Sequence, residues 1–199
     1  MSKINAICVY CGSSPGTDPA FVEAAHGFGK ILAANGVRLV YGGGSVGLMG
    51  ALASSVISHG GMATGIIPEF LTAKERPRRL GQEQIITRDM HERKATMFDR
   101  ADAFVALPGG IGTLEELVEQ MTWAQLGRHK KPILIANING FWDPLLVLLD
   151  HMRSLGLVPS RAEELLVADH IDDILPKLRE AARAVSEAET EMVFPAERM

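Results

Sequence analysis

Three glycine-rich turns have the residue types needed to hold a phosphate group. They are Cys11-Gly12-Ser13-Ser14, Gly42-Gly43-Gly44-Ser45 and Pro108-Gly109-Gly110-Ile111-Gly112-Thr113, and each follows a short apolar run. Glycines let the backbone approach a ligand closely, and the free N–H groups at the start of a helix attract anions. The last two turns each lead into a helical pattern. Although a single such turn could be no more than a tight turn, three after successive strands predict a phosphate site.

Two common nucleotide motifs fit these turns poorly. The run from Gly42 to Gly47 formally matches the dinucleotide pattern G-x-G-x-x-G. However, no acidic residue closes a following strand at the distance needed to hold a ribose, so the sequence argues against NAD. A P-loop is also excluded, because no turn supplies Gly-Lys-Ser/Thr after its glycines.

The segment from Thr113 to Glu116 has two interpretations. Threonine followed three residues later by glutamate, ahead of an apolar-periodic helix, is typical of a capping box, and spacing alone favours that role. A capping carboxylate would nevertheless lie beside the phosphate-ready turn, where it could also meet a ligand.

The charged helix predicted over 89–100 has the pattern of a solvated helix face. Within it, however, Met90, Arg93, Lys94 and Met97 share one stripe, so Arg93 lies beside apolar positions. Cys8 and Cys11 form a CxxC, but Cys8 falls inside a strand and no second Cys/His pair lies near. We therefore predict no metal and no redox site.

The elements that must position these residues alternate between apolar runs and helical patterns. We predict strands at 4–10, 37–41, 62–67, 83–87, 103–107, 132–136 and 165–167. Helices are predicted at about 18–36, 48–60, 89–100, 113–127, 143–152 and 171–185, with a long loop over 68–84. Asp18-Pro19 is a helix start signal, and Gly36 is the matching stop.

This alternation implies right-handed crossovers and a parallel sheet, and continuous apolar strands predict a sheet covered on both faces. The predicted fold class is α/β, a three-layer, Rossmann-like, doubly wound parallel sheet. We expect one nucleotide-binding domain over 1–185 and a frayed tail over 186–199.

Composition excludes several classes of protein. The 199 residues are 47% hydrophobic, and the net charge of -4 argues against a general nucleic-acid binder. Two cysteines are too few for a disulfide scaffold. The sequence shows neither a secretory signal nor an apolar run long enough to cross a bilayer, so we expect a cytoplasmic protein without membrane contact.

Several of these stretches together resemble one family. Residues 108–116 match the PGGxGTxxE motif of the Lonely guy (LOG) family, the cytokinin riboside 5′-monophosphate phosphoribohydrolases formerly labelled lysine decarboxylases. The first two turns, the segment Met90-His91-Glu92-Arg93-Lys94 and the helix end over 122–127 also resemble that family. The likeness runs from about Ile4 to about Leu178.

The resemblance implies hydrolysis of the N-glycosidic bond of adenine-type nucleoside 5′-monophosphates, with or without a cytokinin side chain, to free base and ribose 5-phosphate. It implies no cofactor, and its catalytic pair falls on Arg93 and Glu116. A carboxylate can stabilise the oxocarbenium-like transition state of this reaction and orient water, and an arginine can hold that carboxylate.

The resemblance further implies a set of substrate contacts and an assembly into homodimers or larger homo-oligomers. The contacts would be Ser13, Gly43, Gly44, Glu75, Met90, Lys94, Gly109, Gly110, Ile111, Gly112, Thr113, Leu114, Glu115 and Thr122. Because Glu115 and Thr122 are seven residues apart, both can face one pocket.

Two other functions remain open at this point. Related proteins handle the molybdenum cofactor, so a non-catalytic nucleotide or cofactor carrier on the same scaffold is the alternative. An amino-acid decarboxylase would need a pyridoxal-binding lysine, and neither Lys94 nor Lys130-Lys131 lies in a recognisable context for it.

Overall fold

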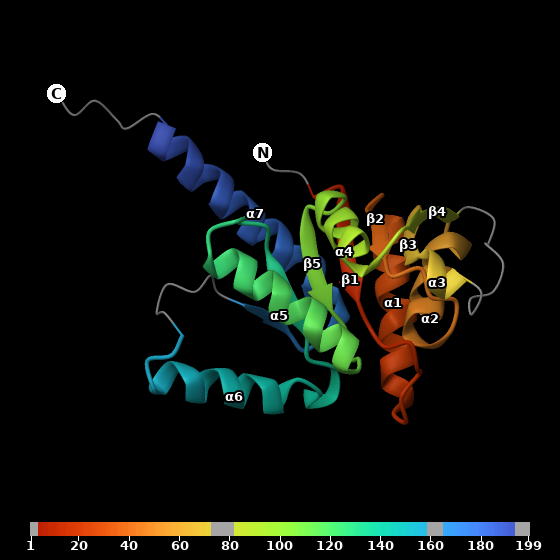
Figure 1. Cartoon of the computed structure of the whole chain (residues 1–199), viewed down its shortest axis with the longest axis horizontal. Coiled ribbons are helices and arrows are strands. Elements are labelled where there is room, and N and C mark those ends of the chain that lie inside the picture. Colours follow the sequence, from red (N-terminus) through yellow and green to blue (C-terminus); the bar gives the residue numbers. More distant parts are fainter. Residues whose placement is uncertain (1–3, 73–81, 159–164, 194–199) are drawn as a thin grey trace.

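The chain folds around one seven-stranded sheet (Figure 1). The computed structural model describes residues 4–72, 82–158 and 165–193. Its strands are β1 (Ala6–Tyr10), β2 (Arg38–Tyr41), β3 (Ala63–Pro68), β4 (Gln82–Thr87), β5 (Ala103–Ala106), β6 (Ile133–Ala136) and β7 (Leu166–Ala168). Its helices are α1 (Pro19–Ala34), α2 (Gly47–Ser58), α3 (Glu69–Thr72), α4 (Met90–Asp99), α5 (Ile111–Gln125), α6 (Asp143–Ser154) and α7 (Ile171–Val193), with a 3-10 turn, η1 (Ile138–Gly140).

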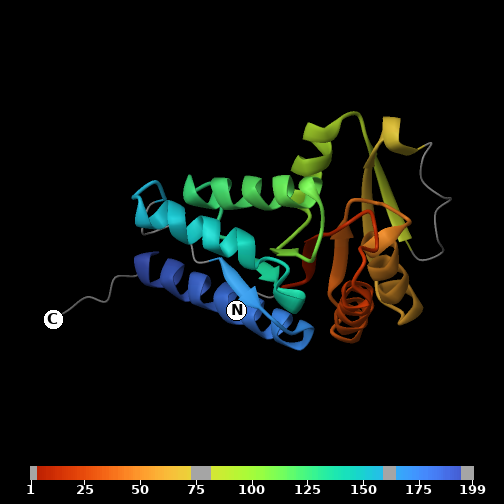
Figure 2. The ribbon, with the colours of Figure 1, turned by 90° about the horizontal axis from the view of Figure 1, so that it is seen from below.

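Helices cover both faces of the sheet, which confirms the predicted three-layer α/β fold. Side chains alternate along β1: Ile7 and Val9 pack into one core, while Cys8 and Tyr10 pack into the other. The first core lies under α1, α2 and α7, and the second under α4, α5 and α6. Figure 2 shows these two helical layers on opposite sides of the sheet. Burial on both faces explains why the strands are continuous apolar runs.

The strand order places the three glycine-rich turns together. The order is β4-β3-β2-β1-β5-β6-β7, and every pairing is parallel. Connections therefore reverse direction between β1 and β5, and ligands bind at such a switch point. The Gly12 N–H donates to the Pro108 carbonyl at 3.1 Å, and the Leu48 N–H donates to the Gly12 carbonyl at 3.0 Å. These two bonds join the first turn to the third turn and to the start of α2.

Local signals at α1 act as predicted. Asp18 is the N-cap, since its Oδ1 accepts the Ala20 N–H at 2.9 Å, and Pro19 is the first helical residue. Beyond the C-terminus of the helix, Gly36 has a φ of +65°, a conformation that favours glycine.

Several element boundaries differ from the sequence predictions, chiefly in three regions. Helix α5 begins at Ile111 rather than Thr113. The predicted loop over 68–84 contains the short helix α3, and β4 begins within it at Gln82. Helix α7 continues to Val193, into the segment predicted as a tail, and residues 194–199 lie outside the described part of the chain. Among the described helices, none is both long and apolar enough to cross a membrane.

Candidate active site

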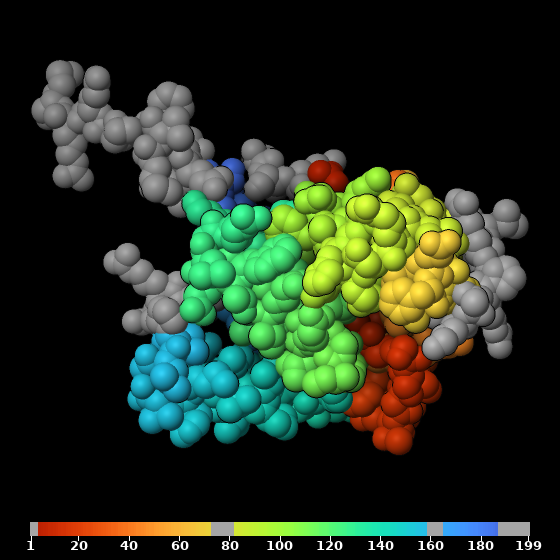
Figure 3. All heavy atoms as spheres, viewed as in Figure 1, coloured from red at the N-terminus to blue at the C-terminus, as the bar shows by residue number. Residues whose placement is uncertain are grey.

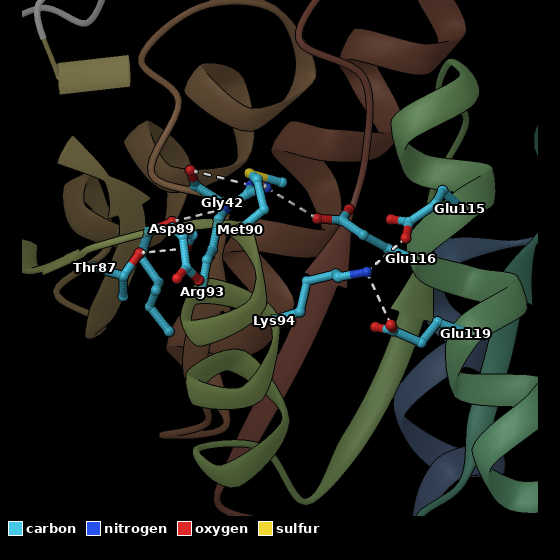
Figure 4. Close-up of polar contacts among 10 residues, drawn as sticks. Gly42, Thr87, Asp89, Met90, Arg93, Lys94, Glu115, Glu116 and Glu119 are labelled. Atoms are coloured by element: carbon cyan, nitrogen blue, oxygen red, sulfur yellow. Dashed lines mark hydrogen bonds and ion pairs between the residues drawn. The ribbon is translucent and has the colours of Figure 1, made fainter. Parts of the chain in front are cut away.

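Arg93 and Glu116 form a buried ion pair between α4 and α5. The Arg93 Nη1 lies 3.3 Å from the Glu116 Oε1, and each side chain is 11% exposed. Figure 4 shows the arginine reaching from α4 across to the carboxylate on α5. The two residues that the family resemblance singles out are therefore in contact, close to the switch point.

Backbone carbonyls of two strand ends hold the Arg93 guanidinium. Its Nε donates to the Ile66 carbonyl on β3 at 3.1 Å, and its Nη2 donates to the Gly42 carbonyl after β2 at 3.4 Å. A Cβ at position 42 would lie 2.1 Å from that Nη2, so only glycine leaves room for the guanidinium there. Arg93 is thus fixed to the sheet and not only to its own helix.

Burial makes Glu116 a weaker acid than an exposed glutamate. Desolvation raises its pKa from 4.5 to about 7, against the opposing effect of Arg93. The nearby Glu115 raises this pKa further, and Lys94 lowers it. Near neutral pH the carboxyl group can therefore both give and take a proton.

The predicted capping box is wrong. The N-cap of α5 is Gly110, which makes no side-chain cap; its carbonyl accepts the Leu114 N–H at 3.1 Å. Thr113 lies inside the first turn and is buried, and Glu116 reaches towards α4 instead of back to the helix start. The glycines allow the helix to begin three residues earlier than a Thr113 cap would, which frees Glu116 for contact with Arg93.

Lys94 links α4 to α5 beside this pair. Its Nζ donates to the Glu115 Oε1 at 2.6 Å and to the Glu119 Oε1 at 2.8 Å. Partial burial disfavours the charged lysine, but these two hydrogen bonds outweigh it, so the pKa of Lys94 lies above its ordinary value. Lys94 is therefore a fixed positive charge at the site.

The start of α5 is open in the way that an anion site requires. The first N–H groups of a helix have no acceptor within it. A Cβ added to Gly110 or Gly112 would meet nothing within 4 Å, so space is available beside these groups. By contrast, a Cβ at Gly109 would lie 2.2 Å from the Thr113 Oγ1, so this glycine is needed for close packing of the turn.

A cavity of about 230 Å³ lies at the switch point, where the first and third turns meet. Ser13, Gly109 and Gly110 line it, together with Phe21 and Phe141, which the sequence did not single out. The two rings pack edge to face with centroids 5.4 Å apart. Phe141 follows β6, so only the strand order reveals that it lies beside the first turn.

The remaining contacts expected from the resemblance lie at different distances from the Arg93–Glu116 pair. Met90 lies beside the pair, with its sulfur 3.9 Å from the Arg93 Nη1. Gly43 and Gly44 are buried in the second turn, Leu114 packs on the core, and Ile111 is exposed. Thr122 lies about 10 Å along the helix axis from Glu115, and its hydroxyl donates to the Val118 carbonyl at 2.8 Å. Glu75 lies outside the described residues.

Other features compete poorly as reaction centres. A larger cavity of about 590 Å³ lies between α7 and the strands β6 and β7, but it is lined mainly by lysines and apolar residues and lacks the arginine–carboxylate pair. Cys8 and Cys11 are free and buried, and burial raises the pKa of both thiols. Within the described ranges, no group of three or more His, Cys, Asp or Glu side chains could hold a metal ion.

Sequence reasoning missed Glu119 as a member of the site. The signal was present, because Glu115 and Glu119 are four residues apart and so share one side of α5. What the spacing could not supply was the position of Lys94 opposite them, which depends on how α4 packs against α5.

Comparisons with known proteins connect this geometry with a reaction. The family described as "Possible lysine decarboxylase" matches residues 49–178. The cytokinin riboside 5′-monophosphate phosphoribohydrolase LOG7 of Arabidopsis thaliana is 44% identical over 191 residues, covering 96% of this chain and 85% of the relative. The rice (Oryza sativa subsp. japonica) enzyme LOG, of the same description, is 46% identical over 167 residues, covering 84% of this chain and 69% of the relative.

Solved structures share the fold at much lower identity. The molybdenum cofactor binding protein of Rippkaea orientalis has a TM-score of 0.66 and 18% identity, covering 90% of this chain and 98% of the other. The molybdenum cofactor carrier protein of Chlamydomonas reinhardtii has a TM-score of 0.65 and 20% identity, with coverage of 92% and 99%. At these identities the likeness establishes the fold alone.

Proposed function

The chain belongs to the LOG family of phosphoribohydrolases, and on that premise we propose its substrate and the residues that act on it. The substrate is an adenosine 5′-monophosphate, with or without a cytokinin-type group on the base. Water cleaves the bond between C1′ and the base nitrogen, which yields the free base and ribose 5-phosphate.

Glu116 and Arg93 are the catalytic pair in this proposal. As the glycosidic bond breaks, its electron pair leaves with the base nitrogen and positive charge develops on the ribose. The ionised Glu116 stabilises that charge, and it takes a proton from the water that attacks C1′. The base nitrogen takes up one proton in exchange, so that the hydroxyl of water ends on the ribose and a hydrogen on the base. Arg93 holds the carboxylate in place and favours its ionised form, against the burial that opposes it.

The phosphate would bind where the glycine-rich turns meet. The open N-terminus of α5 offers backbone N–H groups, and Ser13 is exposed beside them. The buried Arg93–Glu116 contact at 3.3 Å is the observation that carries the proposal, because it joins an arginine to a carboxylate of raised pKa that lies on the helix whose N-terminus would bind the phosphate.

Neither competing function has comparable support. Lys94 donates to two carboxylates and its pKa is raised, so it stays protonated, whereas a Schiff-base lysine must be neutral. A cofactor carrier is favoured only by fold likeness at 18–20% identity, and a pure carrier would have no need of a buried acid–arginine pair.

A product assay tests the reaction. Purified protein is incubated with AMP and with isopentenyl-AMP, and free base and ribose 5-phosphate are separated by chromatography. Wild-type protein should release base, the rates should rank the two substrates, and Glu116→Gln should abolish release. If wild-type protein binds nucleotide but releases no base from either, the hydrolase assignment fails for these substrates and the carrier takes its place.

We also propose that the chain acts as a homo-oligomer through α5 and α6. Ile111, Val118 and Leu126 are exposed and spaced so that they share one face of α5 with Glu115 and Thr122. Val147 and Leu148 on α6 are also exposed, and Figure 3 shows α5 and α6 next to each other on one surface. A second copy that covered this face would enclose Thr122 and extend the pocket towards the base.

A further inference from the structure

Lys94 is held by two carboxylates that differ in their surroundings. Glu115 and Glu119 approach its Nζ from successive turns of α5, as Figure 4 shows. The Glu115 side chain is 53% exposed, whereas that of Glu119 is 21% exposed and that of Lys94 is 14% exposed. The Glu115 contact is the shorter of the two, but an ion pair away from water is screened less, so the Glu119 contact is the one less open to competition from solvent.

Glu119 occupies its position at a cost. Its Oε2 is buried and has no hydrogen-bond partner among the described residues, so only Oε1 is compensated, by Lys94. A buried polar atom left in this way costs folding free energy, so its presence calls for a functional explanation. Besides its direct charge effect on Glu116, Glu119 can influence the reaction through its contact with Lys94.

Charged and titratable groups surround Glu116 from three elements. They are Arg93 and Lys94 on α4, Glu115 and Glu119 on α5, and Cys8, Tyr10 and Cys11 on and just after β1. The two cations favour the ionised carboxylate, and the two neighbouring carboxylates oppose it. Since Arg93 is fixed by backbone carbonyls, Lys94 is the cation whose place depends on α5 side chains.

We propose that Glu119 is a positioning residue for the hydrolysis: it anchors Lys94 between α4 and α5, beside Glu116. The exposed Glu115 is then free to turn towards a substrate without releasing the lysine. This inference rests on the proposed function, because its consequence is measured in the rate of base release.

The test compares the acid limb of the kcat/KM–pH profile between two backgrounds. In the otherwise wild-type protein, Glu119→Leu leaves Lys94 with the exposed Glu115 as its one carboxylate partner among the described residues, so the lysine should move away from Glu116. This should raise the midpoint of the acid limb and lower kcat/KM near neutral pH by about fivefold. Glu119→Gln keeps an oxygen for Lys94 and removes a negative charge, so it should lower the midpoint. In a protein that already carries Lys94→Met there is no lysine to displace, so Glu119→Leu only removes a negative charge. In that background it should lower the midpoint of the acid limb.

Glu119→Leu should therefore raise the midpoint when Lys94 is present and lower it when Lys94 is replaced by methionine. A merely structural role for Glu119 would not produce this reversal. If Glu119→Leu lowers the midpoint in both backgrounds, or leaves it unmoved, the proposal is overturned. Should the leucine variant fail to fold, Glu119→Ala tests the same reversal. Absence of base release by the wild-type protein would instead be a failure of the proposed function.

Glu83→Leu is the matched control for loss of a half-buried carboxylate. On β4, Glu83 pairs with Arg38 at 3.4 Å, and it takes no part in the site. The variant should leave the acid limb at the wild-type midpoint even if it lowers the melting temperature. A shift in this control as large as that in Glu119→Leu would also overturn the proposal.

Discussion

At the scale of the residue, the protein keeps a carboxylate where water is scarce. Glu116 is nearly buried, and its pKa of about 7 reflects desolvation that Arg93 only partly offsets. A group of this kind changes its protonation state within the physiological range, so both rate and stability should depend on it.

The first prediction concerns pH and Glu116. Because the reaction needs the ionised carboxylate, kcat/KM should rise with pH and level off above about 7. The folded protein favours the protonated form, so this residue contributes most to stability below 4.5 and loses that contribution as pH rises through 7. As the pH rises from 4.5 to 7, the free energy of unfolding of the wild-type protein should fall by up to about 3 kcal/mol more than that of the Glu116→Gln variant.

Denaturant unfolding at several pH values, alongside the rate profile, checks this prediction. Parallel stability curves for wild-type and Glu116→Gln protein would contradict a raised pKa in the folded state. Loss of activity at all pH values in the variant is expected in either case, so the stability comparison is the independent measurement.

At the scale of the element, α5 combines an open start with a carboxylate one turn later. Gly110 caps the helix without a side chain, and Gly112 faces open space, so an anion can approach the first N–H groups. The same early start turns Glu116 towards α4. One helix thus presents both the proposed phosphate site and the proposed catalytic carboxylate.

The second prediction is that Gly112→Ala separates ligand binding from folding. An alanine Cβ meets nothing within 4 Å in the free protein, and alanine favours helix, so the melting temperature should hold or rise slightly. The methyl group would occupy space reserved for the phosphate, so KM for the nucleotide should increase. Inhibition by ribose 5-phosphate should weaken in parallel, and unchanged KM and inhibition would place the phosphate elsewhere.

The same scale explains what the sequence could and could not predict. Element order, the Asp18 cap and the meeting of the glycine turns follow from local patterns and from the rule for parallel sheets. The N-cap of α5 could not be predicted in this way, because the same few residues are compatible with a capping box at Thr113 and with a helix start at the glycines. Lys94 opposite Glu119 depends on which helices become neighbours, and that is set by strand order rather than by spacing.

At the scale of the whole molecule, one layer of helices carries several exposed apolar side chains on its outer side. Residues of α5 and α6 that point away from the sheet remain exposed, among them Val118, Leu126 and Leu148. A surface of this kind beside the proposed reaction site is suited to association with a second copy.

The third prediction is that Leu126→Lys weakens this association. Leu126 is 71% exposed at the end of α5, where a positive charge suits the helix dipole, so the folded monomer should remain stable. Light scattering should show the mass fall from a dimer or larger species to a monomer. Ile86→Lys, at an exposed position on edge strand β4, should leave the mass unchanged; a monomeric wild-type protein would refute the proposed assembly.

The two carbonyl groups that hold Arg93 differ in which substitutions their residues can tolerate. Ile66 contributes only a carbonyl oxygen, which every amino acid possesses, so other branched apolar residues of similar volume can take its buried place. Position 42 must also lack a side chain, because any Cβ there would clash with the Arg93 guanidinium, so no other residue can replace Gly42. In a library selected for base release, position 66 should therefore drift among valine, leucine and isoleucine, while position 42 stays glycine.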